Sequence, residues 1–145
     1  MGVKDFFTEE QQSAIVQAIA DAEKATSGEI RVHLESSCKG DVLDNAVYIF
    51  KKLKMHKTAL RNGVLVYLSI NDRKLAILGD AGINAKVPDG FWDSIKDAMI
   101  SNFTKGEITL GLTQGIHMIG EKLKTYFPYM EDDTNELSNE ISFGA

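Results

Sequence analysis

The sequence has little that would support chemistry by cysteine or histidine, and no run long enough to cross a membrane. A single cysteine, Cys38, excludes an internal disulfide and a zinc site built from several cysteines. The three histidines fall in separate segments without the spacing of a metal-binding pair. The longest unbroken apolar run, residues 64–68, is far shorter than the ~20 residues that a span needs. The start of the chain lacks a secretory signal, so we expect a soluble, cytoplasmic protein.

Acidic residues outnumber basic ones, but the excess lies at one end of the chain. There are 21 acidic and 16 basic residues, and the net charge is −5. Residues 131–145 hold five of the acids and no Lys or Arg, so the charges of residues 1–130 balance. A neutral body predicts no nucleic-acid partner, because such binding rests on many phosphate contacts. We expect one domain, residues 1–130, and an acidic tail, residues 131–145, that is either flexible or an edge strand.

The spacing of apolar residues predicts an α/β fold. Helical spacing is found over about residues 8–26, 41–53, 89–103 and 107–123. The stretch "EIRVHLES" alternates as a strand with one face buried, and this alternation predicts a surface or second-layer position for His33. "NGVLVYLSI" and "RKLAIL" predict an antiparallel hairpin, and the helix before it predicts a parallel crossover. The order implies a three-layer αβα sandwich, with a small mixed sheet of about three or four strands and helices on both faces.

The last predicted helix contains three glycines, Gly111, Gly115 and Gly120. Each costs up to about 1 kcal/mol relative to alanine in a helix interior. Because glycine lets two backbones approach closely, we expect this helix to pack tightly on the sheet.

Two loops are rich in oxygen ligands. Residues 35–44 follow a predicted parallel strand, where ligands of open α/β sheets gather. Residues 79–93, within "LGDAGINAKVPDGFWD", follow a strand whose direction reverses. Calcium takes about six to eight oxygens from carboxylates, amides and backbone carbonyls, and irregular loops often supply them. We therefore predict a calcium or magnesium site that crosslinks the two loops, and its candidate ligands are Asp41, Asp44, Asp80, Asn84, Asp89 and Asp93.

Helix capping is the alternative explanation for four of these acids. Asp41 and Asp89 suit N-cap positions, Asp44 suits a capping box, and Asp93 suits the positive end of a helix dipole. Capping does not account for Asp80, which lies well before the next predicted helix.

Catalytic signatures are otherwise missing from the sequence. There is no G-x-S-x-G, P-loop, G-x-G-x-x-G or histidine-rich metal motif. Cys38 has no matched histidine, so we interpret it as a plain loop cysteine.

Three segments together resemble the TPM domain, a family named after thylakoid, photosystem II repair and nematode membrane proteins. They are "SGEIRVHL", "NGVLVYLSINDRKLAILGDAGINAKVPD" and "FTKGEITLGLTQGI", and the resemblance covers about residues 8 to 126. It implies a helix–sheet–helix sandwich, calcium binding, and association with assembly or repair of membrane complexes. A phosphatase activity is attributed to the plant branch. The P-D signature carries Asp89 over as a site residue, whereas Asp80 and Asn84 are inferred locally.

Two functions follow as hypotheses. The first is a divalent-metal-binding regulatory or interaction domain, stand-alone and acting on a protein partner that the sequence does not identify. The second is a metal-assisted phosphatase, for which Lys39 and Lys86 are the cations in the two loops. A structural domain whose acids only cap helices is the remaining alternative.

Overall fold

The computed structural model describes residues 2–130 and 135–144. In chain order its elements are η1 (Val3–Phe6), α1 (Glu9–Glu23), β1 (Glu29–Glu35), α2 (Val42–Lys52), η2 (Met55–Lys57), β2 (Gly63–Ser69), β3 (Lys74–Gly79), α3 (Ala81–Asn84), α4 (Asp93–Thr104), α5 (Ile108–Leu123) and β4 (Ser142–Phe143). The short helix α3 was not predicted, and the helix expected from residue 89 begins later, at Asp93.

The four strands form one mixed sheet in the order β3-β2-β1-β4. β1 runs parallel to β2, with Glu29 opposite Gly63 and Glu35 opposite Ser69. β3 returns antiparallel to β2 as a hairpin, and Gly79 lies opposite Val64. The predicted crossover and hairpin are therefore both confirmed.

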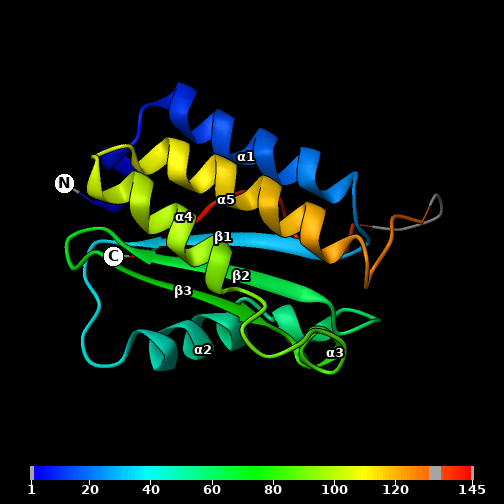
Figure 1. Ribbon diagram of the computed structural model, residues 1–145. Coiled ribbons are helices and arrows are strands. Elements are labelled where there is room, and N and C mark those ends of the chain that lie inside the picture. Colours follow the sequence, from blue (N-terminus) through cyan, green and yellow to red (C-terminus); the bar gives the residue numbers. More distant parts are fainter. Residues whose placement is uncertain (1, 131–134, 145) are drawn as a thin grey trace.

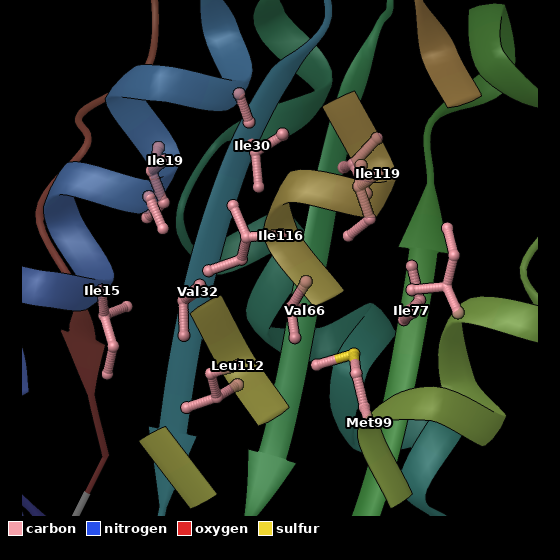
Figure 2. Packing of buried hydrophobic residues seen from close by; sticks show 14 of the residues in the cluster. Ile15, Ile19, Ile30, Val32, Val66, Ile77, Met99, Leu112, Ile116 and Ile119 are labelled. Atoms are coloured by element: carbon pink, nitrogen blue, oxygen red, sulfur yellow. The ribbon is translucent and has the colours of Figure 1, made fainter. Parts of the chain in front are cut away.

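Helices cover both faces of the sheet, which confirms the three-layer αβα sandwich. α1, α4 and α5 lie on one face, and α2 lies on the other (Figure 1). Alternation along β2 divides its side chains between the two cores: Val64, Val66 and Leu68 face the larger core, and Leu65 and Tyr67 face the smaller one. In Figure 2 the larger core is made of Ile15 and Ile19 from α1, Leu112, Ile116 and Ile119 from α5, Met99 from α4, and Ile30, Val32, Val66 and Ile77 from the strands.

The glycines of α5 pack against neighbouring helices rather than against the sheet. A Cβ atom at Gly120 would lie 2.9 Å from the Cα atom of Ala22 in α1, and one at Gly115 would lie 2.5 Å from Cγ of Met99 in α4. The expected close approach exists, but its partner differs from the prediction. The larger apolar side chains of α5 face the sheet, so the glycines lie on the flanks that meet α1 and α4.

The C-terminal segment forms an edge of the sheet. Ser142 and Phe143 pair in parallel with His33 and Leu34 of β1. The buried Leu137 donates its backbone N–H to Oε1 of Glu29, at 2.7 Å. The described part of the tail thus covers the side of β1 that β2 leaves open.

Candidate functional site

Asp41 and Asp44 lie at the N-terminus of α2. Oδ1 of Asp41 accepts hydrogen bonds from the backbone N–H groups of Leu43, at 2.7 Å, and Asp44, at 3.3 Å. Asp41 is therefore the N-cap of α2. Asp44 is exposed in the first turn, where the helix dipole favours a negative charge.

Asp80 is buried and fully engaged by protein donors. Arg61 donates from Nε to Oδ2 at 2.7 Å and from Nη2 to Oδ1 at 2.8 Å, a bidentate ion pair. Oδ1 also accepts from the N–H of Ala81, so Asp80 caps α3. These hydrogen bonds raise the pKa of the Arg61 guanidinium above its ordinary value. The cation that Asp80 binds is thus the guanidinium of Arg61.

Two glycines of the 79–93 loop serve close packing. A Cβ atom at Gly79 would lie 2.8 Å from Cγ2 of Ile83, and one at Gly82 would overlap the carbonyl oxygen of Leu60. Gly82 also donates its N–H to the Arg61 carbonyl at 2.9 Å. This part of the loop is therefore folded against the segment before β2, with no cation required.

The second half of the loop forms a cleft that collects the other three candidates. Asn84, Asp89 and Asp93 line a cleft of about 280 Å³, together with Lys96 of α4. Nδ2 of Asn84 donates to the Gly79 carbonyl at 3.0 Å, which leaves its Oδ1 available as an acceptor. No hydrogen bond or ion pair engages the carboxylates of Asp89 and Asp93 within the described part of the chain.

A turn at Gly90 places the Asp93 carboxylate beside the backbone that follows Asp89. Gly90 has φ of +75°, and a Cβ atom there would lie 3.1 Å from Oδ2 of Asp93. The Asp93 carboxylate therefore folds back over the turn that carries Asp89. Lys122 of α5 secures the next residue by donating from Nζ to the carbonyl of Phe91 at 3.1 Å.

The 35–44 and 79–93 loops are not brought into one site. β1 ends at Glu35 opposite Ser69, whereas β3 ends at Gly79 opposite Val64, so the loops leave opposite ends of the sheet. They also lead to helices on opposite faces, α2 and α4 (Figure 1). The antiparallel return of β3 is the physical reason. The crosslink expected between Asp41 or Asp44 and the other four candidates is therefore corrected.

At the carboxyl end of β1, the 35–44 loop is held by an acid outside the predicted set. Asp72, in the β2–β3 turn, accepts from the backbone N–H of Cys38 and, at 2.8 Å, from Oγ of Ser69. The hydrogen bond from Cys38 and then that from Ser69 lower the pKa of Asp72. Asp72 is thus a structural link between two loops.

His33 is buried, which corrects the predicted surface or second-layer position. Its Nδ1 lies 2.8 Å from Oγ of Ser142, and its Nε2 lies 2.9 Å from Oε1 of Glu35. Its ring stacks on Tyr67, with centroids 5.5 Å apart. Burial lowers the pKa of His33, and the Glu35 carboxylate partly opposes that shift. The C-terminal strand covers this side chain, which alternation within β1 alone does not reveal.

Among residues 2–130 and 135–144, no three His, Cys, Asp or Glu side chains are grouped so as to hold a metal ion. The site that the sequence candidates do form is the cleft of Asn84, Asp89 and Asp93, with two carboxylates and one amide.

Comparison with known proteins decides the family. The family model of the TPM domain matches residues 3–122. The chain belongs to the TPM domain family. Among solved structures, this TPM domain resembles the NMR structure of BA42 from the psychrophilic bacterium Bizionia argentinensis, at 50% identity, a TM-score of 0.91 and 96% coverage of each chain. No curated protein matches it.

Two more distant structures share the fold of this TPM domain. An N-terminal domain of a P. gingivalis protein has 20% identity and a TM-score of 0.69, with 83% of this chain and 78% of that chain covered. The N-terminal domain of cg2496 from Corynebacterium glutamicum has 15% identity and a TM-score of 0.61, with 96% and 80% covered. In the described part of the present chain, none of the helices has the length and apolar character of a membrane span.

Proposed function

We propose that this TPM domain is a divalent-cation-binding interaction domain, and that Asn84, Asp89 and Asp93 bind calcium or magnesium. One observation carries the proposal: Asp89 and Asp93 line the same cleft, and neither carboxylate has a hydrogen-bond or ion-pair partner in the described part of the protein. A cation in this cleft would contact carboxylate oxygens that no protein donor engages, and it would offset their negative charges.

The chemistry of the cleft suits a hard cation. Carboxylate, amide and carbonyl oxygens are the ligands that calcium and magnesium prefer. The Asn84 side chain presents Oδ1 because its nitrogen is already occupied by the Gly79 carbonyl. With two carboxylates, fewer than in a calcium-sensor loop, the expected dissociation constant is about 10⁻⁴–10⁻³ M.

Binding would order a surface next to the cleft. One side of the loop is held by Lys122, which bonds both the Phe91 carbonyl and, at 2.9 Å, Oγ of Ser94. A cation between Asp89 and Asp93 would hold the other side. The exposed turn between them would then have one conformation when metal is bound, and a protein partner that recognises this turn would respond to metal concentration.

Calorimetry with matched variants tests the assignment. We expect the double variant Asp89→Asn/Asp93→Asn to weaken calcium affinity at least about tenfold, because asparagine keeps the shape but removes both charges. Asp44→Asn is the control, since Asp44 is also exposed in a first helical turn but belongs to α2, on the opposite face of the sheet. An equal loss of calcium affinity in the double variant and in Asp44→Asn would contradict the site assignment. Unchanged calcium binding in the double variant would also contradict it.

A metal-assisted phosphatase is the second candidate, and Lys96 is the observation that favours it. Lys96 lines the same cleft as Asp89 and Asp93, and its ammonium group would pair with a phosphate that also contacts a bound cation. Lys39 and Lys86, expected in this role, are not among the residues that line the cleft. Turnover of p-nitrophenyl phosphate with calcium, magnesium or manganese, lost in Lys96→Gln and in Asp89→Asn, would support this function. Absence of turnover with all three metals would contradict it.

The cytoplasmic location and the protein partner stay predictions. A pull-down from lysate, with calcium or with chelator, tests for a metal-dependent partner. The cellular location of a captured partner would then indicate the compartment in which the two proteins meet.

A further inference from the structure

A second cleft lies at the end of the sheet where β1 and β2 finish. It is enclosed by η1, the β2–β3 turn and the turn between α4 and α5, all at one end of the molecule (left in Figure 1). Its volume is about 450 Å³, within the range of about 300–1,000 Å³ typical of small-molecule sites. Ligands of open α/β sheets commonly bind beyond the carboxyl ends of parallel strands, which is where this cleft is.

The cleft wall is mostly apolar. The side chains that form it include Phe6, Leu68, Ile70, Ile100, Phe103 and Ile108. Phe6 is 52% exposed and Ile100 is 45% exposed, so two large apolar side chains of the cleft are exposed to solvent. Such a surface favours a ligand with an aliphatic or aromatic body.

Among the described residues, Arg73 is the one charged residue that lines the cleft. No hydrogen bond or ion pair engages its guanidinium within the part of the chain that the structure describes. Its φ is +53°, a conformation that glycine or asparagine would adopt at less cost, so the turn alone does not favour arginine. Arg61 shares this conformation, at φ +51°, and its guanidinium is paired with Asp80. The corresponding anion for Arg73 is absent from the described chain.

We propose that this cleft binds an aliphatic monocarboxylate such as a medium-chain fatty acid. The chain lies among Leu68, Ile100 and Phe103, and the carboxylate pairs with the guanidinium of Arg73. A planar guanidinium matches a carboxylate with two parallel hydrogen bonds. Arg73 is exposed, and a single exposed cation beside an apolar wall favours a monoanion over a phosphate dianion and disfavours an amine.

This binding site is independent of the proposed cation site. The two clefts share no lining residue: Asp93 begins α4, whereas Ile100 and Phe103 lie toward its end. Each site can therefore be lost while the other stays intact.

The test uses decanoate, decanol and decylamine below their micelle concentrations, followed by calorimetry and by amide NMR of the full chain. We expect saturable binding of decanoate, with shifts at the β2–β3 turn and in residues 100–108, and weaker binding of decanol. Arg73→Gln should weaken decanoate binding about twofold to fivefold, the range of an exposed ion pair, and leave decanol unchanged, because only the carboxylate pairs with the guanidinium. Lys57→Gln is the control, since it removes an exposed charge outside this cleft.

Ile100→Gln tests the apolar contribution to ligand binding separately from that of the Arg73 charge. It should weaken decanoate and decanol alike, and because Ile100 is partly exposed the fold should persist, as amide spectra would verify. The proposal is overturned if decanoate binds no better than decanol or decylamine. It is also overturned if Arg73→Gln binds decanoate as the wild type does, or if the shifts lie elsewhere.

Discussion

Arg61 and Asp80 form a bidentate ion pair, with 2.7 Å from Nε to Oδ2 and 2.8 Å from Nη2 to Oδ1. This pair ties the segment before β2 to the first turn of α3, so Asp80 has a structural role. A loop acid that resembles a metal ligand in the sequence is thus already neutralised within the protein.

Asp80→Ala is expected to lower the free energy of unfolding and leave calcium binding unchanged. Loss of the N-cap alone costs about 1 kcal/mol. Urea unfolding measures the first effect and calorimetry the second. A variant that unfolds at the wild-type urea concentration, or that loses calcium binding while still folded, would contradict the structural role.

The stability of the domain is expected to fall as pH decreases below about 6.5, because of His33. Burial lowers the pKa of His33 in the folded state, so the unfolded chain takes up the proton first. The stability contributed by the neutral imidazole is therefore complete above the unfolded pKa, and it is lost as pH falls toward the folded pKa. Thermal unfolding at pH 7 and at pH 5 measures how steeply the stability changes with pH.

His33→Gln should remove much of the change in stability between pH 7 and pH 5, since glutamine does not titrate in this range. His117→Gln is the control, because His117 is exposed and lies 3.9 Å from Asp21. An unchanged slope in His33→Gln would show that another group causes the pH dependence.

Gly120→Ala is expected to destabilise the protein although alanine favours helices. The new Cβ atom would lie 2.9 Å from backbone atoms of Ala22, which cannot move away as a flexible side chain can. Overpacking of this kind costs about 1–3 kcal/mol. Gly2→Ala is the matched control, because nothing lies within 4 Å of its Cβ position. Denaturant unfolding of the two variants should differ, and equal stabilities would contradict the close approach of α5 to α1.

Local patterns predicted most of the fold. The alternation in "EIRVHLES" located β1, and the apolar run after Asn62 located β2. Their parallel crossover and the following hairpin led to the mixed sheet. These signals are strong because each element must bury one face, so its spacing appears in a short stretch of sequence.

Contacts between distant residues account for what the sequence did not reveal. His33 is buried by Ser142, at the far end of the chain, and Asp80 is paired with Arg61 from the segment before β2. No rule of sequence spacing connects His33 to Ser142 or Asp80 to Arg61. The 35–44 and 79–93 loops lie at opposite ends of the sheet because β3 runs antiparallel to β2. The predicted hairpin indicated this direction, but the composition of the loops does not. Of the six predicted ligands, Asn84, Asp89 and Asp93 line one cleft, whereas Asp41 and Asp44 lie at the N-terminus of α2 and Asp80 pairs with Arg61.

The measurement that tests the central claim most directly is a calcium titration of the metal-free protein followed by amide NMR. The cation site predicts saturable shifts concentrated in residues 84–96, with half-saturation at about 10⁻⁴–10⁻³ M and little change in residues 35–44. Shifts centred on residues 35–44, or none up to about ten times the upper end of that range, would contradict it.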